Sequence, residues 1–266
     1  MFRLVKPEER QAVVAFLKKE SDLNLFFLAD IEFYGWDKDF LQVWRDDTQE
    51  LHSIVLRYNN NLLVYSDDCS FDRNEIFVFI RKYAIHHLSG GRKFYDYMKP
   101  LLEKKHYDIF PCISAKMKRL THFSVAGKPR KATAEDARKI AESITTIGEF
   151  SSYRDVPLEQ TIATIHKAIA DGFGIYYVIE EDGKVVASAA TIALCSVSAM
   201  IGGVFALPEY RNKGYATSLT GLLCQELLSK GITPVLFFEN PLAASIYHRL
   251  GFVDFGEWIF MDVHQQ

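Results

Sequence analysis

The feature that most constrains the fold is a strand, a charged turn and a helix that follow one another near residue 210. Residues 199–206 are almost wholly apolar and favour a buried strand. The turn after them contains Arg211, Lys213 and Gly214, and leucines at helical spacing predict an amphipathic helix over 215–229. Free backbone N–H groups at a helix N-terminus, with two cations beside them, are typical of an anion site. We expect this turn to bind a diphosphate.

A second segment, 25 residues or so further on, strengthens this interpretation. Asn240 stands where an N-cap belongs and Pro241 at the first helical position, and a Leu250-Gly251-Phe252 sequence closes the predicted helix. Tyr247 lies two turns into this helix. By itself such a tyrosine is more often a packing residue, and a short R-x-x-G-x-A pattern also recurs by chance. The two segments in this order make a much more specific pattern than either alone.

The elements predicted around these segments form two series with the same order. Each half reads as two helices, three strands, a helix, a strand, a helix and a strand, which indicates a duplicated fold. The hairpin turns are predicted at 59–61 and 182–183, and Gly90-Gly91 is read as the start of a helix. In the first half we predict helices over 7–20, 24–34, 72–82 and 92–105, and strands over 41–45, 51–58, 62–65, 84–88 and 107–117. In the second we predict helices from the capping box at 133–136 and over 157–170, 215–229 and 241–250, with strands over 174–181, 184–194, 199–206, 234–239 and 252–263.

These motifs resemble those of the GCN5-related N-acetyltransferase (GNAT) superfamily, and within it the FR47-like and glycine-N-acyltransferase-like branch. The matching residues are Ile201-Gly202-Gly203-Val204, Pro208-Glu209-Tyr210-Arg211, Lys213-Gly214-Tyr215-Ala216 and Asn240 with Tyr247 and Gly251. The motifs cover about 200–252, and the preceding elements extend the resemblance to about Arg130. The resemblance implies an α/β fold (a mixed α+β sheet) of two GNAT-like lobes, each a mixed, mostly antiparallel sheet flanked by helices. We place a degenerate lobe at 1–120, a linker at 121–129 and an acetyltransferase domain at 130–266.

The resemblance implies a site for acetyl-CoA, or another acyl-CoA, and assigns roles to matching positions. Backbone groups of Val204, Phe205 and Ala206 would pair with the pantetheine arm, which requires this strand to move away from the next one. Relatives often carry Tyr at 205 and Thr at 206, so a hydroxyl contact is absent here. Tyr247 would face the thioester sulfur as general acid, and Asn240 and Ser245 would contact the cofactor. The diphosphate would be held at Arg211, Asn212, Lys213, Gly214, Tyr215 and Ala216.

The identity of the general base is left open by the sequence. An amine acceptor is mostly protonated at neutral pH and must lose a proton before it attacks the thioester. Glu149 is the residue that we predict for this role, because the aromatic and polar run after it suits a pocket wall. Glu142 and Asp155 are alternatives in the same region, and a solvated carboxylate is the simpler reading of each.

The first half departs from the motif at the matching position. Its segment 66–73 contains Asp67, Asp68 and Asp72 and no Arg-x-x-Gly pattern, so it would repel a diphosphate. Leu102 stands where the second half has Tyr247. We therefore predict that the first lobe does not bind acyl-CoA and instead packs against the second lobe and shapes access for the acceptor.

Charge and cysteine spacing argue against nucleic-acid binding and against a metal site. The formal net charge is -3, which gives nucleic acid no general attraction, and the four cysteines have no C-x-x-C spacing that would indicate a metal. No apolar run predicts a signal peptide or a membrane span, so we expect a cytoplasmic protein without membrane partners.

The function predicted is acyl-CoA-dependent N-acyltransfer, with acetyl passing to a primary amine of a small molecule by direct attack in a ternary complex. One alternative is a non-catalytic acyl-CoA sensor or interaction protein. Another is an aminoacyl transferase that uses charged tRNA, against which the intact diphosphate turn and the lack of a basic stripe both argue. The acceptor, the acyl chain length and the oligomeric state, a homodimer included, are left open.

Overall fold

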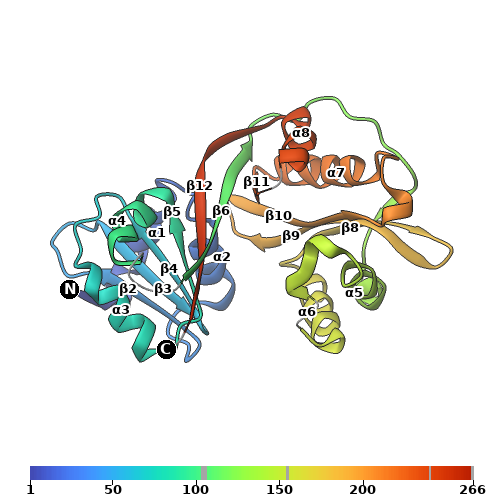
Figure 1. The fold of residues 1–266 in the computed structure, drawn as a ribbon. Helices are drawn as coiled ribbons and strands as arrows, with labels where there is room; N and C mark the ends of the chain where they lie inside the picture. Colours follow the sequence, from blue (N-terminus) through green and yellow to red (C-terminus); the bar gives the residue numbers. More distant parts are fainter. Residues whose placement is uncertain (103–106, 154–155, 240, 265–266) are drawn as a thin grey trace. The chain divides into compact units, whose positions relative to one another are not determined.

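A computed structural model describes residues 1–102, 107–153, 156–239 and 241–264, and their side chains except those of 151–153 and 241–243. The fold is of the mixed α/β class, with a large mixed sheet flanked by helices, as predicted (Figure 1). The chain divides into two compact units. The N-terminal unit comprises Met1–Ala115, Phe237–Glu239 and Asp254–Gln266, and the C-terminal unit comprises Lys116–Leu236 and Asn240–Val253.

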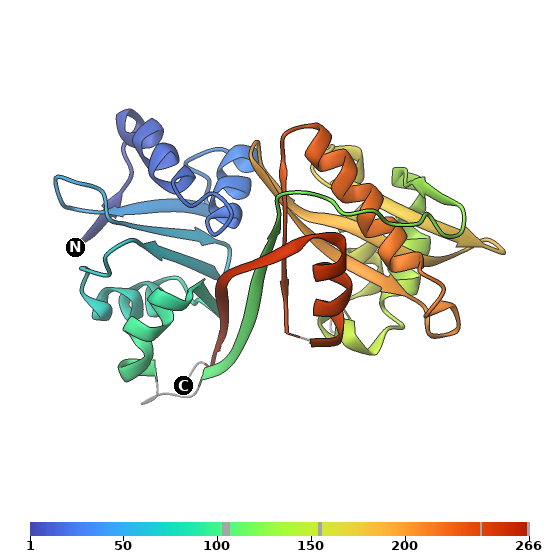
Figure 2. The same ribbon diagram turned by 90° about the horizontal axis from the view of Figure 1, so that it is seen from above.

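The N-terminal unit is a sheet with helices on both faces. Strands follow the order β1-β2-β3-β4-β5-β12-β6, and β4 and β5 are the parallel pair among its registered neighbours. Helices α1 and α2 cover one face and α3 and α4 the other (Figure 2). Its helices are α1 (Arg10–Lys18, after the 3-10 turn Pro7–Glu9), α2 (Leu25–Tyr34), α3 (Arg73–Lys82) and α4 (Arg92–Leu102). Its strands are β1 (Phe2–Leu4), β2 (Leu41–Asp46), β3 (Ser53–Tyr58), β4 (Asn61–Ser66), β5 (His87–Gly91), β6 (Tyr107–Met117) and β12 (Phe252–Val263).

The C-terminal unit repeats this plan. Strands β11, β10, β9, β8 and β7 are neighbours in that order, and β10 and β11 are the parallel pair. Helices α5 and α6 lie on one face of the sheet, and α7 and α8 lie on the other (Figure 1). Its helices are α5 (Ala137–Ile144), α6 (Leu158–Ala170), α7 (Tyr215–Ser229) and α8 (Pro241–Leu250). Its strands are β7 (Pro129–Lys131), β8 (Tyr176–Glu181), β9 (Lys184–Leu194), β10 (Ser198–Ala206) and β11 (Thr233–Phe238).

The two series of elements predicted from the sequence are both present in this order. In each unit three antiparallel strands lead into a helix and then a parallel fourth strand. The hairpin turns also have the expected backbone, because Asn59, Asp182 and Gly183 all have positive φ. Local apolar patterns and turn residues were sufficient here to predict the order of these elements.

Three details differ from the sequence prediction. Strand β5 runs on through Gly90-Gly91, which therefore end a strand and do not start a helix. Gly90 is required there, since a Cβ would lie 2.7 Å from the carbonyl oxygen of Val64. The short strands β1 and β7 were not predicted, because three-residue strands carry too little periodicity.

The last strand also differs from its predicted place. We expected 252–263 to complete the C-terminal lobe, but residues 258–262 of β12 pair antiparallel with β5 in the N-terminal unit. Trp258, Ile259 and Met261 are fully buried there, and the last two join the core formed by α3 and α4. Strand pairing between segments so far apart leaves no local signal in the sequence. The domain boundaries predicted from the sequence (1–120, 121–129 and 130–266) stay a prediction, because the two compact units are defined by contacts within the fold.

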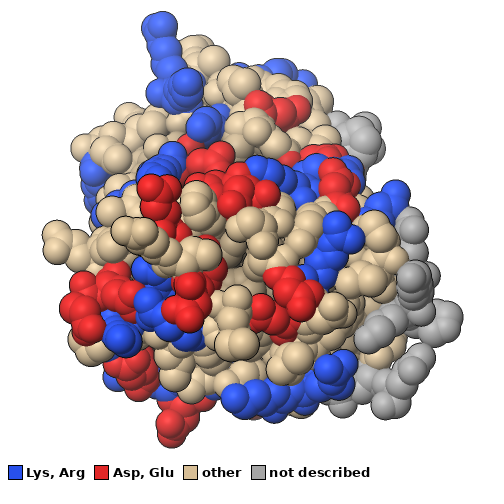
Figure 3. Space-filling view, turned by 90° about the vertical axis from the view of Figure 1, so that its left-hand side faces the viewer, with Lys and Arg blue, Asp and Glu red and all other residues tan. Residues whose placement is uncertain are grey.

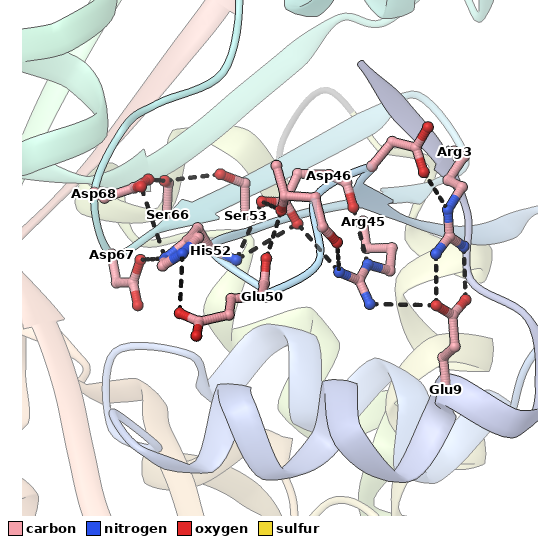
Figure 4. Close-up of polar contacts among 12 residues, drawn as sticks. Arg3, Glu9, Arg45, Asp46, Glu50, His52, Ser53, Ser66, Asp67 and Asp68 are labelled. Carbon is pink, nitrogen blue, oxygen red and sulfur yellow. Dashed lines mark hydrogen bonds and ion pairs between the residues drawn. The ribbon is translucent and has the colours of Figure 1, made fainter.

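The loop between β4 and α3 of the N-terminal unit is occupied by the protein's own polar groups (Figure 4). His52 Nδ1 lies 3.0 Å from a carboxylate oxygen of Asp67 and 3.7 Å from one of Asp68. Asp72 caps α3 by accepting a hydrogen bond of 2.9 Å from the backbone N–H of Asn74. The acidic residues that distinguish this loop from its counterpart at Arg211 thus have partners within the unit.

Charges of both signs are interspersed on one face of the N-terminal unit. Figure 3 shows acidic and basic residues side by side there, without a broad area of one sign on that face. Arg3 pairs with both Glu9 and Asp47, and Arg45 pairs with Glu9. Because these pairs join opposite charges, they carry little net field.

The N-terminal turn of α5 provides a test of the fold. Asp136 accepts two hydrogen bonds of 2.8 Å from Arg130 and one of 2.8 Å from the Thr133 backbone N–H. The Arg130 guanidinium lowers the pKa of Asp136 from 3.8 to about 2. A carboxylate with a lowered folded-state pKa stabilises the fold above pH 4, and this stabilisation disappears as the pH falls toward 2.

We predict that Asp136→Asn lowers the free energy of unfolding at pH 7 by about 1–2 kcal/mol, after allowance for the exposure of Arg130. Urea unfolding at pH 7 and at pH 3 measures this. The difference between wild type and variant should shrink at pH 3. A difference that is the same at both pH values would contradict the assignment.

Candidate functional site

Strand β10 separates from β11 part of the way along its length, as the resemblance of the motifs implied. The parallel register joins Ser198, Ala199 and Met200 to Thr233, Pro234 and Val235 and goes no further along β10. On its other edge β10 stays paired with β9 as far as Ala206, with a register shift between Gly202 and Phe205. A bulge of this kind bends a strand and changes the direction of its peptide groups. The edge of β10 that includes Val204, Phe205 and Ala206 is therefore left without a strand partner among the registered pairs.

The turn after β10 has the backbone of an anion site. Asn212 has φ +62° and Gly214, the N-cap of α7, has φ +78°. Hydrogen bonding within α7 begins with Ser218 N–H, which donates to the Gly214 carbonyl at 2.9 Å. The N–H groups at the start of the helix thus have no acceptor within it. A left-handed residue beside a helix N-terminus lets successive N–H groups converge on one point.

The need for glycine at position 214 comes mainly from its backbone angle. A Cβ there would lie 3.5 Å from the Cβ of Ala126, which is an ordinary contact. The positive φ, however, would strain any other L-residue. The backbone angle, and not the space around the Cβ position, thus favours glycine here.

A cavity of about 620 Å³ opens between the turn and α8, within the C-terminal unit. Predicted residues from four separate segments of the chain meet on its wall. Lys213 and Ser245 do not line it, and the Lys213 ammonium instead lies 4.4 Å from the centre of the Tyr210 ring. Asn240, predicted to contact the cofactor, lies outside the described residues. The predicted residues on the wall are Glu149, Val204, Phe205, Ala206, Arg211, Asn212, Gly214, Tyr215, Ala216 and Tyr247.

Several lining residues were not predicted as site residues. Tyr210 lay within a quoted motif but was given no role, and Arg249 was passed over although it is a cation two residues after the acid candidate Tyr247. Phe150 begins the run after Glu149 that we expected to form a pocket wall, and it lines the cavity. The others are apolar or small, so nothing in the sequence distinguishes them from core residues. They are Ile147, Thr217 and Ile246.

Tyr247 is half-buried on α8, and its ring centre lies 6.0 Å from that of Phe252. Burial raises the pKa of Tyr247, and nearby Cys224 raises it further. The phenol is therefore protonated over the physiological range and can act as a hydrogen-bond donor. Cys224 and Cys195 are both buried, as expected for core residues, and burial raises the pKa of the Cys224 thiol.

Glu149 lies at the other side of the cavity, in the 3-10 segment Gly148–Tyr153. Its carboxylate is 60% exposed and lies 3.0 Å from the guanidinium of Arg211. The next residue, Phe150, packs edge-on against Phe205 of β10 with ring centres 6.4 Å apart. Glu149 is thus held against the diphosphate turn. Of the alternatives, Glu142 is exposed and pairs with Arg138, and Asp155 lies outside the described residues.

Residues 119–127, which overlap the predicted linker at 121–129, lie against both α7 and α8. Thr121 N–H donates to the Leu250 carbonyl at 3.0 Å, and Ala126 N–H donates to the Ser218 hydroxyl at 3.1 Å. Phe123 covers Gly221, where a Cβ would lie 2.6 Å from its ring. One extended segment therefore joins the start of α7 to the end of α8, which bears Tyr247.

No helix among the described residues is long and apolar enough to cross a bilayer. This agrees with the absence of an apolar run in the sequence.

Comparison with known proteins identifies the domain that carries this site. Residues 172–254 match the model of the Acetyltransferase (GNAT) domain. No curated protein matches the chain. The match lies within the C-terminal half and includes the residues whose motifs resembled those of this family. The finer placement in the FR47-like and glycine-N-acyltransferase-like branch stays a prediction.

Solved structures share the fold over almost the whole chain. A Drosophila protein is 12% identical with a TM-score of 0.69, covering 99% of this chain and 98% of that one. A GCN5-related N-acetyltransferase-like protein from Streptococcus suis is 15% identical with a TM-score of 0.61, covering 97% and 100%. A tandem GNAT protein from the clavulanic acid biosynthesis pathway is 12% identical with a TM-score of 0.56, covering 100% and 99%. At these identities the likeness shows a common fold.

The contact between residues 119–127 and α8 can be tested at Gly251. This glycine has φ +105°, and a Cβ would lie 2.3 Å from the carbonyl oxygen of Arg119. Gly231, which follows α7, is a matched control because it has φ +72° but open space around it.

We predict that Gly231→Ala lowers the free energy of unfolding by about 1–2 kcal/mol through backbone strain alone. Gly251→Ala should cost about 1–3 kcal/mol more, because a backbone carbonyl must move. Chemical denaturation of both variants measures the difference. Equal losses would show that residues 119–127 do not pack on α8.

Proposed function

We propose that this protein is an acyl-CoA-dependent N-acyltransferase that transfers acetyl to a primary amine of a small molecule. The observation that carries the proposal is the unpaired edge of β10 directly before the turn at Arg211. Backbone N–H and C=O groups require partners, and an extended amide chain such as pantetheine supplies them as a neighbouring strand would. The same path leads to the converging N–H groups at the start of α7.

The residues present fit an acyl-CoA. The positive φ of Asn212 and Gly214 forms a concave surface of N–H groups, and Arg211 adds a cation beside it. The cavity next to them is apolar around Phe205 and Tyr247, which suits a thioester. The bound acyl-CoA would supply an activated acyl group with a thiol as leaving group. No covalent attachment to the buried Cys224 is required.

The remaining chemistry is assigned to the chain's own groups. An amine would add to the thioester carbonyl carbon and lose a proton to a base or water, and the C–S bond would then break and release the thiolate. A backbone N–H of Val204 or Phe205 would donate to the carbonyl oxygen as it gains charge. Tyr247 would donate a hydrogen bond to the departing sulfur. Because its pKa is raised, we propose that it stabilises the thiolate chiefly as a donor.

We propose Glu149 as the base. We also propose, from the sequence, that the N-terminal lobe is degenerate, that the acceptor is a small molecule and that the protein is cytoplasmic. The acidic loop before α3, whose side chains have their own partners, supports a lobe that does not bind acyl-CoA.

The experiment that tests this function is thiol release from acetyl-CoA in the presence of amines, amino acids, polyamines and aminoglycosides. We expect release that depends on one class of amine. Binding of acetyl-CoA with no turnover across the panel would instead favour a non-catalytic acyl-CoA sensor.

Cofactor binding can be tested at the turn itself. Gly214→Glu places a negative charge and a strained backbone where the diphosphate is proposed to bind. We predict that acetyl-CoA, which raises the melting temperature of the wild type by mass action, no longer does so in this variant. Asp171-Gly172 offers a matched control, because Gly172→Glu also adds a charge at a glycine of positive φ with open space. A normal acetyl-CoA shift in Gly214→Glu would remove the turn from the site.

The role of Tyr247 can be separated from binding. We predict that Tyr247→Phe lowers kcat at least tenfold and changes the affinity for acetyl-CoA less than threefold, because the lost hydroxyl acts on the leaving sulfur. Steady-state kinetics and calorimetry measure the two effects. An unchanged kcat would exclude the hydroxyl from the mechanism.

A further inference from the structure

The ion pair between Glu149 and Arg211 occupies the cation that the proposed function assigns to the diphosphate. The two groups lie 3.0 Å apart, and both line the cavity. Arg211 is 45% exposed and also approaches the Ala206 carbonyl at 3.4 Å. The guanidinium thus sits between the strand edge and the turn, and a carboxylate from a different segment is held against it.

A carboxylate and a phosphate compete for the same face of a guanidinium. Both accept N–H hydrogen bonds from Arg, and the Glu149 carboxylate already lies 3.0 Å from the Arg211 Nη2 group that a phosphate would also contact. An exposed ion pair is weak, whereas a diphosphate also gains the N–H groups at the start of α7. A diphosphate should therefore displace Glu149 from Arg211 at a modest cost in affinity.

The segment that bears Glu149 has the means to remain near the site after displacement. Phe150 anchors this segment by packing on Phe205. The backbone of Phe150, with φ -104° and ψ 46°, is not helical, so the 3-10 segment bends at this residue. The carboxylate is 60% exposed and can reorient without opening a packed core.

We infer that Glu149 is a placeholder for the diphosphate: it neutralises Arg211 in the free protein and is released toward the acceptor side of the cavity when acyl-CoA binds. This inference rests on the proposed function. It assigns regulation to that site, because the carboxylate that would accept the amine's proton is engaged until the acyl donor is in place. If acyl-CoA raises the affinity for an amine that contacts released Glu149, linkage requires that this amine raise the affinity for acyl-CoA by the same factor.

The other charges around Arg211 do not make the same contact. Lys213 lies over the Tyr210 ring, and Glu209 is exposed on the 3-10 turn Pro208–Tyr210 two residues before Arg211. Glu209→Gln therefore removes one negative charge near the turn without removing the ion pair. It is the matched control for the general effect of charge on binding a polyanion.

The test measures the dissociation constant of coenzyme A by calorimetry for the wild type, Glu149→Gln, Arg211→Gln, the double variant and Glu209→Gln. We expect Glu149→Gln to bind coenzyme A twofold to fivefold more tightly than the wild type, in the range of an exposed ion pair. Glu209→Gln should have a clearly smaller effect. In the Arg211→Gln background the gain from Glu149→Gln should disappear, because its partner is absent.

The outcomes distinguish this inference from the proposed function. If coenzyme A binds the wild type but Glu149→Gln leaves its affinity unchanged or weaker, the placeholder role is wrong and the function stands. A gain equal to that of Glu209→Gln, or one that persists without Arg211, also overturns it. If coenzyme A does not bind the wild type at all, both are wrong. Melting temperatures of the free variants, expected to lie near that of the wild type, show that each is folded.

Discussion

The site depends on a strand that leaves its neighbour. Backbone N–H and C=O groups in a sheet are almost always paired, so a strand edge without a partner is costly unless water or a ligand satisfies it. Strand β10 keeps its pairing with β9 and ends its registered pairing with β11 at Met200. The bulge near Gly203 and the turn at Arg211 accompany this separation, and both change the direction of the chain there. The cavity lies beside the edge of β10 that this separation leaves without a strand partner.

The two units share one order of elements but differ where the corresponding strand leads into a helix. In the N-terminal unit β4 and β5 pair over residues 61–64 and 87–90, and the helix that follows β4 is capped by Asp72. In the C-terminal unit the parallel pair is shorter relative to its strands, and the helix is headed by Gly214, which has no side chain to offer. The difference lies in a few residues at the end of one strand. Side chains satisfy the helix N-terminus in one unit and leave it available in the other.

The elements around the cavity are tied together by the chain that precedes them. Residues 119–127 bond to the end of α8 and to the first turn of α7, and their packing explains why Gly221 and Gly251 have no room for a Cβ. On the opposite side, Glu149 and Phe150 contact Arg211 and Phe205. The contacts of residues 119–127, which contain no catalytic motif, therefore help to position the proposed acid, Tyr247, relative to the turn. This is the kind of support that precise positioning of reacting groups requires.

The sequence by itself determined the order of the elements, the hairpins at Asn59 and Asp182, and the strand, turn and helix around Arg211. These features are local: apolar periodicity, residues that tolerate positive φ and helix caps all act over a few neighbouring positions. Only the tertiary structure decided that β12 pairs with β5, that Arg249 and Tyr210 reach the cavity, and that Glu149 lies against Arg211. Each of these joins residues distant in the chain, and the free energy that selects such contacts comes from burial and charge pairing in the assembled fold, which leave no short-range pattern.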